Sequence, residues 1–212
     1  MARSQGRAAG QRGSSSASQV HVTPTSTVSE VPVPGDVPRF DIPAWRERYG
    51  VVAGITGRGS EPGPGFDLGL WSREPVGEVM SRWLAFRRGS SDFTAVVLGN
   101  QVHGTKVRRI DRSEGWTQVE GIDGWVTSTP GVLLTVTVAD CVPVYLVAPG
   151  RAVALLHAGW RGTAGGILEQ GLGALLEASR SNPANVVMHC GVGICGQCYE
   201  VGSEVLTGCG VP

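Results

Sequence analysis

The chain has 212 residues, enough for one domain with a full hydrophobic core, and 41% of them are hydrophobic. No segment approaches the roughly 18 uninterrupted apolar residues of a membrane span. The 18 basic residues balance 18 acidic ones, so the charge favours neither nucleic acid nor a membrane surface as a partner. The five cysteines are odd in number and no secretory signal is evident, so we expect free thiols and a cytoplasmic protein.

The first residues are predicted to form a disordered tail over 1–38. Stretches such as GSSSAS, TPTST and VPVPGDVP are rich in serine, threonine and proline and show no apolar period. We expect the folded domain over residues 45–212.

Apolar periodicity then predicts strands and two helices along the chain. Strands are expected at 50–56, 94–102, 124–128, 132–140, 142–148, 152–158 and 185–193, and helices at 76–88 and 165–180. Strands outnumber helices, and hairpins fit the spacing better than a regular alternation of strand and helix. The pattern therefore predicts a mixed α/β domain.

Three potential metal ligands are each placed at the end of an apolar strand. His103 follows LGNQV, Cys141 follows VLLTVTVAD, and His157 follows AVALL. Active-site groups are often placed this way, because the strands fix the backbone while the loops leave access for a ligand.

A hairpin would bring two of these residues together. If 142–148 pairs with 152–158 across the turn PGR, the numbers of opposed residues sum to about 298 to 300. A sum of 298 places Cys141 directly opposite His157, whereas a sum of 299 places them on opposite faces. The hairpin thus predicts that Cys141 and His157 lie close together, but it does not determine the register of the two strands.

Two histidines and one cysteine form a known three-ligand set for zinc, which keeps its fourth position for water or substrate. Thiolate and imidazole suit zinc or copper better than magnesium or calcium. Asp140 adjoins Cys141 and is a candidate proton acceptor or orienting group. Arg161 lies in a Gly-rich loop before a predicted helix, which suits an anion such as phosphate.

The same residues admit two other interpretations. The histidines can be hydrogen-bonded core residues beside a buried thiol, or Cys141 and His157 can be a nucleophile and its base without a metal. The motif CGQC at 195–198 is typical of a redox dithiol or half of a zinc site. It does not open a helix after a thioredoxin-like βαβ unit, so the sequence does not favour the redox interpretation.

Four motifs together carry a specific resemblance. NQVHGTKV, DGWVTSTPGVLLTVTVADCVPVYL, LLHAGWRGTAGGI and GVGICGQCYEVG occur in that order. Between about Gly50 and Val205 the chain resembles the multicopper polyphenol oxidase, or laccase-domain, family. Members of this family are also described as purine nucleoside phosphorylases and as peptidoglycan editing factors. The resemblance implies a single α/β domain with a mixed-sheet, layered α/β/β/α sandwich.

The resemblance also implies a site and an activity. A zinc ion would be bound by His103, Cys141 and His157. The implied reactions are phosphate-dependent cleavage of adenosine, guanosine, inosine and methylthioadenosine, and deamination of adenosine. Arg58, in GITGRG, matches an arginine of the family's early motif, so Arg58 and Arg161 are candidates for contact with phosphate or substrate and Asp140 for catalysis. Family members continue beyond the position of Pro212, so we expect the domain to lack its C-terminal part.

Three alternative functions remain. One is a copper-dependent oxidase of phenols, although laccase chemistry needs many more histidines than this domain offers. Another is a cysteine hydrolase or editing factor that acts on peptidoglycan precursors, with Cys141 as its nucleophile. The last is a binding module without catalysis.

Overall fold

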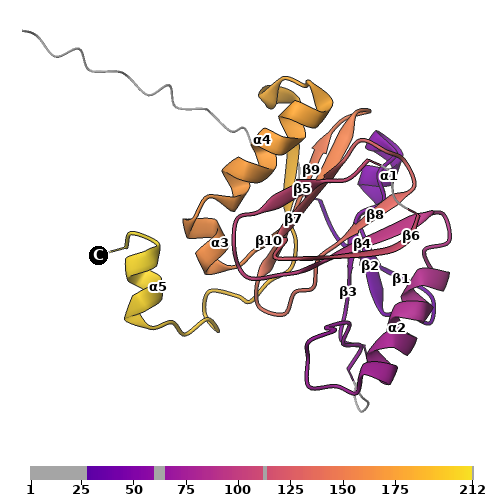
Figure 1. Cartoon of the computed structure of the whole chain (residues 1–212), viewed down its shortest axis with the longest axis horizontal. Coiled ribbons are helices and arrows are strands. Elements are labelled where there is room, and N and C mark those ends of the chain that lie inside the picture. Colours follow the sequence, from indigo (N-terminus) through magenta and orange to yellow (C-terminus); the bar gives the residue numbers. More distant parts are fainter. Residues whose placement is uncertain (1–27, 60–64, 112–113, 212) are drawn as a thin grey trace, which may run out of the picture.

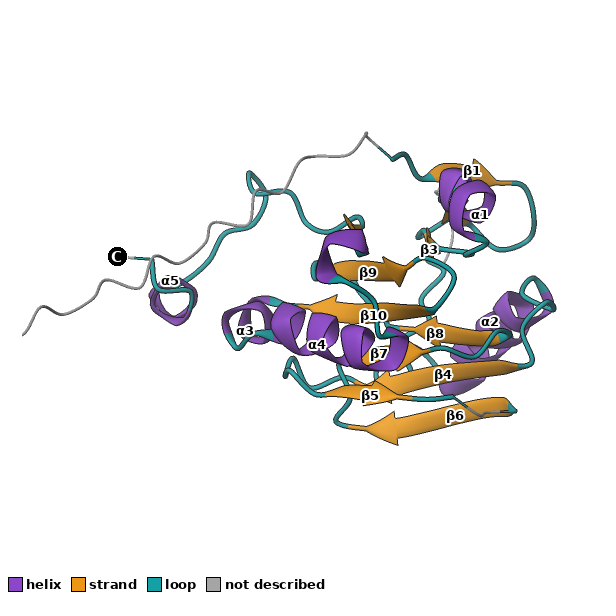
Figure 2. Ribbon diagram, turned by 90° about the horizontal axis from the view of Figure 1, so that it is seen from above, coloured by secondary structure: helices purple, strands orange, loops and turns teal. Residues whose placement is uncertain are grey.

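Two β-sheets face each other, and a helix covers the outer face of each (Figures 1 and 2). The computed structural model describes residues 28–59, 65–111 and 114–211. One sheet has the strand order β11 (Val187–Cys190), β9 (Val142–Ala148), β10 (Ala152–Ala158), β7 (Gly124–Thr127) and β5 (Val107–Arg109). The other has the order β6 (Gly115–Glu120), β4 (Ala95–Asn100) and β8 (Val132–Thr135). Parallel and antiparallel pairs both occur, as the mixed α/β prediction requires.

The alternation of side chains along the strands explains how the five-stranded sheet packs on a helix. In β9 and β10, every second side chain points to helix α4 (Ile167–Ser179) and forms a buried cluster with it. Gly171 of α4 allows a close approach, because a Cβ there would lie 2.4 Å from Leu156 of β10. This cluster contains Val126, Val144, Leu146, Ala154, Leu156, Ile167 and Leu175.

The opposite face of this sheet meets the second sheet. Trp125 of β7 is fully buried against Ala95 and Val97 of β4. The alternate β4 residues Val96 and Leu98 instead pack on the helix α2 (Val76–Arg88), together with its Val79 and Trp83. The layers therefore run α4, five-stranded sheet, three-stranded sheet and α2, which confirms the expected α/β/β/α sandwich.

The N-terminal segment forms a third, small sheet. Its strands are β1 (Val31–Val33), β2 (Arg39–Asp41) and β3 (Gly54–Thr56), with helix α1 (Pro43–Tyr49) between β2 and β3. The predicted tail over 1–38 is therefore wrong at its C-terminal end, because Val31 and Val33 pair with Asp41 and Arg39. The rest of that predicted tail, residues 1–27, lies outside the described residues. Residues 32, 34 and 38 are prolines, which lack the backbone N–H that a strand ladder uses, so the sequence pattern favoured a tail over a strand here.

Tyr145 of β9 joins this small sheet to the core. Its hydroxyl donates a hydrogen bond to the carbonyl of Gly54 at 2.9 Å, and its ring packs edge-on against Trp45. Burial, together with the negative charge of Glu30, raises the pKa of this phenol, so it stays protonated and remains a donor.

We expect Tyr145→Phe to lower the free energy of unfolding by about 1 kcal/mol, because the Gly54 carbonyl loses its partner. Urea denaturation monitored by circular dichroism measures this change. The matched control is Tyr199→Phe, since Tyr199 is exposed. Equal stability of the two variants would contradict the role assigned to Tyr145.

Several predicted elements have different ends in the structure. The strands expected at 94–102 and 132–140 end at Asn100 and Thr135. Beyond these ends the two segments are joined by a side chain instead of by backbone hydrogen bonds. The side-chain amide of Gln101 donates to the carbonyl of Thr137 at 2.8 Å and accepts from the backbone amide of Thr137 at 2.7 Å. The helix expected at 165–180 is confirmed as α4, which spans Ile167–Ser179. Two short helices were not expected: α3 (Trp160–Ala164) precedes α4, and α5 (Ser203–Gly208) follows near the C-terminal end.

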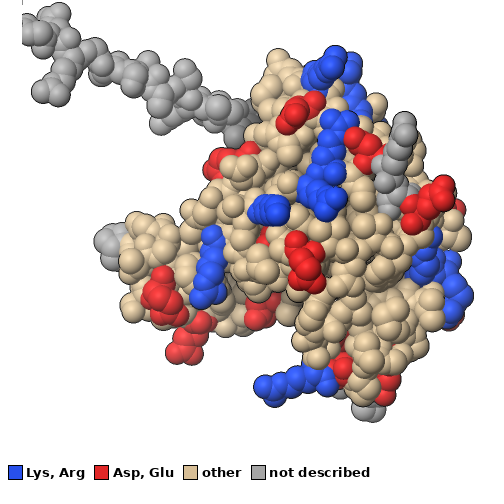
Figure 3. All heavy atoms as spheres, in the orientation of Figure 1, with Lys and Arg blue, Asp and Glu red and all other residues tan. Residues whose placement is uncertain are grey.

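The helices and the surface add three observations. None of the helices in the described part of the chain is long and apolar enough to cross a membrane. On the face shown in Figure 3, acidic and basic side chains are interspersed, in keeping with the equal numbers of each sign. In Figure 2, α5 projects beyond α3 at one end of the domain.

Candidate metal centre

His103, Cys141 and His157 come together in the structure as one cluster, here called the ligand triad. One potential ligand atom from each residue lies within 4.8 Å of the others. The two imidazole rings have their centroids 4.8 Å apart and meet at 74°. His103 is exposed, Cys141 is half-buried and His157 is buried. Within the described residues, no other group of three histidine, cysteine or acidic side chains is arranged to hold a metal ion.

The hairpin register explains how Cys141 meets His157. Ala148 pairs with Ala152 and His157 with Pro143, so the numbers of opposed residues sum to 300. Cys141 precedes β9 by one residue and follows the same alternation as Pro143, which puts it diagonal to His157 on the same face. The expected proximity is confirmed, and the register is the diagonal one rather than the directly opposed one.

Gly159 forms part of the site because it has no side chain. A Cβ at this position would lie 2.9 Å from Cδ2 of His103 and 3.0 Å from Sγ of Cys141. These separations are shorter than normal van der Waals contacts. The ligand triad therefore depends on glycine at the end of β10.

Asp123 is a site residue that the sequence patterns did not reveal. Its side chain is fully buried, and Oδ1 lies 2.9 Å from Nδ1 of His157. The same carboxylate accepts hydrogen bonds from the backbone amides of Val102, His103 and Gly104 at 3.2, 2.9 and 3.0 Å. One carboxylate thus positions two members of the ligand triad.

The hydrogen bonds to Asp123 hold the backbone of His103 in an unusual conformation. Its φ angle is 58°, in the left-handed region that side chains other than glycine rarely adopt. Such a conformation costs about 1–3 kcal/mol and persists only where the surroundings enforce it. The three amide hydrogen bonds to Asp123 provide that enforcement.

Asp123 also selects the form of His157 that can bind a metal. If Nδ1 donates its proton to the carboxylate, Nε2 keeps a free lone pair. Burial lowers the pKa of His157 and the nearby His103 adds to this effect, against the opposing influence of Asp123. The imidazole is therefore neutral near pH 7, as a metal ligand must be.

The chemistry of the donors fits zinc or copper. Burial raises the pKa of the Cys141 thiol, and the charges of Asp140 and Asp123 raise it further. Binding of a soft cation would instead lower the pKa of this thiol, because a thiol that coordinates a metal is deprotonated. Two imidazoles and one thiolate would then leave one position of a tetrahedral ion for water or substrate.

The raised pKa of Cys141 predicts that zinc affinity depends on pH. While the thiol is protonated, zinc must displace one proton, so the affinity should rise about tenfold per pH unit between about pH 6 and 8. His157 adds little to the slope because its pKa is lowered. Competition with a chromogenic chelator measures the slope, and Cys141→Ala should flatten it. An unchanged slope in that variant would exclude Cys141 as the ligand that loses the proton.

The ligand triad lines a large open groove of about 1660 Å³ between the small N-terminal sheet and the two larger sheets. Two of the predicted catalytic residues, Arg58 and Asp140, also line it, and both are exposed. Arg161 is not among the lining residues. Its guanidinium lies over the ring of Trp160, 4.3 Å from the centroid. The structure thus brings five of the six predicted site residues to one groove.

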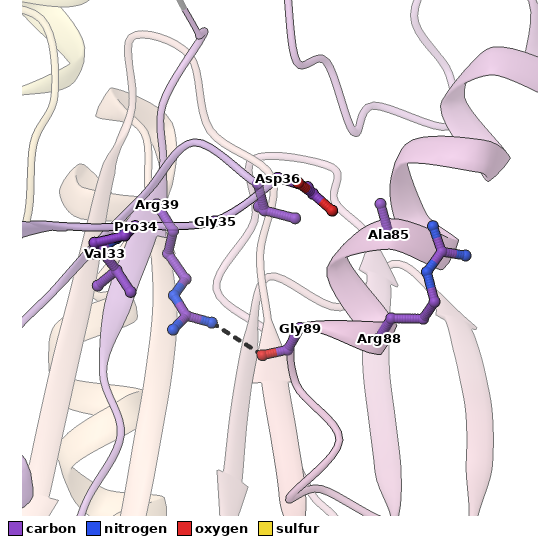
Figure 4. Close-up of a pocket in the computed structure, with 9 residues that line it drawn as sticks. Val33, Pro34, Gly35, Asp36, Arg39, Ala85, Arg88 and Gly89 are labelled. Atoms are coloured by element: carbon purple, nitrogen blue, oxygen red, sulfur yellow. Dashed lines mark hydrogen bonds between the residues drawn. The ribbon is translucent and has the colours of Figure 1, made fainter.

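A second, smaller cavity of about 410 Å³ lies between the β1–β2 hairpin and the C-terminal end of α2 (Figure 4). Arg39 crosses it and donates a hydrogen bond to the carbonyl of Gly89 at 3.2 Å, and it also pairs with Asp41 at 2.9 Å. No member of the ligand triad lines this cavity. Its arginine serves to attach the hairpin to α2.

Comparison with known proteins places the chain in a family. Residues 50–209 match the family model described as multi-copper polyphenol oxidoreductase laccase. The purine nucleoside phosphorylase YlmD of Geobacillus stearothermophilus is 35% identical over 175 residues, covering 74% of this chain and 62% of the relative. The purine nucleoside phosphorylase SCO2081 of Streptomyces coelicolor is 38% identical, covering 62% of this chain and 54% of the relative.

An adenosine deaminase, RL5, from an unknown prokaryotic organism is 34% identical, covering 74% of this chain and 64% of the relative. The chain therefore spans less than two thirds of the length of these three relatives.

Solved structures share the fold. The crystal structure of YlmD from Geobacillus stearothermophilus is 28% identical with a TM-score of 0.74, covering 85% of this chain and 71% of that one. A hypothetical protein YfiH of Bacillus licheniformis is 28% identical with a TM-score of 0.71, covering 82% and 69%. Because the family model matches most of the chain and the fold agrees, the chain belongs to the multi-copper polyphenol oxidoreductase laccase family.

Proposed function

We propose that this protein is a zinc-dependent enzyme of purine nucleosides, which cleaves adenosine, guanosine, inosine and methylthioadenosine with phosphate and deaminates adenosine. The observation that carries the proposal is the ligand triad in an open groove, with the tautomer of His157 set by Asp123. The names of the relatives, purine nucleoside phosphorylase and adenosine deaminase, support this class of substrate.

In this proposal His103, Cys141 and His157 hold the ion. The chemistry that zinc supplies in such a site is that of a Lewis acid, which lowers the pKa of a bound water to about 7. Asp140, which lines the groove next to Cys141, is the candidate to move a proton to or from the purine. Arg58, which lines the same groove, is the candidate to bind phosphate near the sugar.

Two alternatives receive less support from the geometry. A cysteine hydrolase acting on peptidoglycan precursors needs a reactive thiolate, yet burial and nearby carboxylates raise the pKa of the Cys141 thiol. The hydrogen bond between Nδ1 of His157 and Asp123 suits a metal ligand and a catalytic base equally, so it does not separate the two roles. A multicopper oxidase needs further histidines near the ligand triad. His189, the remaining described histidine, pairs instead with Glu30 at 3.2 Å and packs on Trp45.

The deciding experiment is a product assay on purified protein of measured zinc content. Adenosine is supplied with and without phosphate, and the products are separated by chromatography. Adenine with ribose 1-phosphate, or inosine without phosphate, supports the proposal. A folded, zinc-loaded protein that turns over no nucleoside would refute it, and muropeptides or a phenol would then be tested as substrates.

Arg58 and Arg161 offer a matched pair for the phosphate step. We expect Arg58→Gln to raise the KM for phosphate about tenfold, which corresponds to one lost charged hydrogen bond. Arg161→Gln should change it little, because this side chain stacks on Trp160 and does not line the groove. Steady-state kinetics at varied phosphate compares the two. A larger effect of Arg161→Gln would reverse the assignment.

A further inference from the structure

The second cysteine motif of the chain forms a compact exposed pair. Sγ of Cys195 and Sγ of Cys198 lie 3.0 Å apart in a thiol–thiol hydrogen bond. The amide of Cys198 donates to the carbonyl of Cys195 at 3.0 Å, which closes a turn. Such a turn brings its end Cα atoms within 7 Å, and a disulfide bridges Cα atoms about 4.4–6.8 Å apart. The backbone is thus already close to the geometry that a disulfide needs.

The turn is fixed at its start and open to solvent at its tip. The amide of Ile194, the residue before Cys195, donates to the carbonyl of Asp140 at 2.9 Å. Gly193 packs so closely on Val142 that a Cβ there would lie 2.7 Å from its side chain. Both cysteines themselves are exposed and free. A small solute can therefore reach the sulfur atoms without any movement of the fold.

We propose that Cys195 and Cys198 form a redox site that closes to a disulfide by exchange with a small-molecule disulfide of the glutathione class. This site is separate from the ligand triad and does not depend on the proposed nucleoside chemistry. The sequence alone did not favour it, because no thioredoxin-like unit precedes the motif. In the structure, a turn between Cys195 and Cys198 brings the two sulfur atoms together without such a unit.

The exchange takes place in two balanced steps. The thiolate of Cys195 attacks one sulfur of the small disulfide, forming a mixed disulfide and releasing one thiolate. Cys198, after losing its proton to solvent, attacks the sulfur of Cys195 and displaces the second thiolate. The protein loses two hydrogens, and the small disulfide becomes two thiols.

The roles of the two cysteines follow from their environments. The hydrogen bond from Cys198, together with the backbone amides of Gln197 and Cys198, lowers the pKa of Cys195. The hydrogen bond to Cys195 raises the pKa of Cys198. Cys195 is therefore the attacking residue, and Cys198 is the resolving one.

The sequence provides a direct mass-spectrometric test. Arg180 is the last basic residue, so trypsin releases residues 181–212 as one peptide with Cys190, Cys195, Cys198 and Cys209. Cys141 leaves on a different peptide, 113–151. The full-length protein is equilibrated with oxidised and reduced glutathione, with and without a chelator. It is then alkylated with N-ethylmaleimide, digested with trypsin and analysed by mass spectrometry.

We expect oxidised glutathione to remove two alkylated thiols from peptide 181–212, with a Cys195–Cys198 disulfide and no glutathione adduct. Cys198→Ser should trap glutathione on Cys195. Cys190→Ser and Cys209→Ser, which change exposed cysteines outside the turn, should leave the disulfide intact.

Three results would overturn the proposal. The first is full alkylation of all four cysteines in oxidised glutathione. The second is a disulfide that includes Cys190 or Cys209. The third is protection of Cys195 and Cys198 in reduced protein until a chelator is added, which would identify a metal site instead.

Discussion

Asp123→Asn should weaken zinc binding by about 10- to 100-fold, the range typical for loss of a group that orients a metal ligand. The side chain keeps its size, but its NH₂ group cannot accept the backbone hydrogen bonds that the second carboxylate oxygen receives from Val102 and Gly104. It then faces two N–H donors in a fully buried position. The 102–104 loop should shift and take His103 away from the ligand triad.

The measurement is zinc affinity by competition with a chromogenic chelator, combined with circular dichroism to confirm the fold. A cost of about 1–3 kcal/mol in stability should accompany the change, because buried donors lose their partner. Asp92→Asn is the matched control, since Asp92 is exposed. If a folded Asp123→Asn variant bound zinc as tightly as the wild type, Asp123 would have no role in orienting the ligands.

Gly159→Ala should abolish zinc binding at the ligand triad, with an affinity loss of at least about 100-fold. The added methyl group would press on both His103 and Cys141, because its nearest atoms lie 2.9 and 3.0 Å away. The backbone itself accepts alanine, since Gly159 has φ −79° and ψ 167° in the ordinary extended region. The substitution should therefore displace the side chains of His103 and Cys141 and leave the backbone conformation at residue 159 unchanged.

Metal content by mass spectrometry and the melting temperature together test this prediction. We expect a zinc-free protein that still folds. Gly173→Ala is the control, because a Cβ at this helical position meets nothing within 4 Å and should stabilise the helix by about 1 kcal/mol. A Gly159→Ala variant with a full complement of zinc would show that the ligand triad can rearrange around the methyl group.

The ligands themselves could be predicted because each is local to a strand end. His103, Cys141 and His157 follow apolar runs that are visible in the sequence, and the PGR turn places β9 and β10 side by side. The exact register could not be predicted, since a loop one residue longer or shorter would change every pair. The structure shows a three-residue loop, 149–151, with Gly150 at a φ of 69°.

Asp123 could not be identified because its role is entirely non-local. It lies 20 residues from His103 and 34 from His157 along the chain, and IDGW reads as an ordinary turn before a strand. The role of Arg161 stays a prediction. Its place in a Gly-rich loop before a helix suggested an anion site, and in the structure its guanidinium lies over the ring of Trp160. Motif position alone does not determine where a long side chain points.

The left-handed turn at His103 bears on how far the fold depends on its metal. The contacts that enforce this turn come from Asp123, a buried carboxylate, and not from a ligand of the ion. In small zinc domains the free energy of metal binding is itself the free energy of folding. Here hydrogen bonds within the protein hold His103 in place, so a chelator should lower the melting temperature of this protein less than it lowers that of a zinc finger.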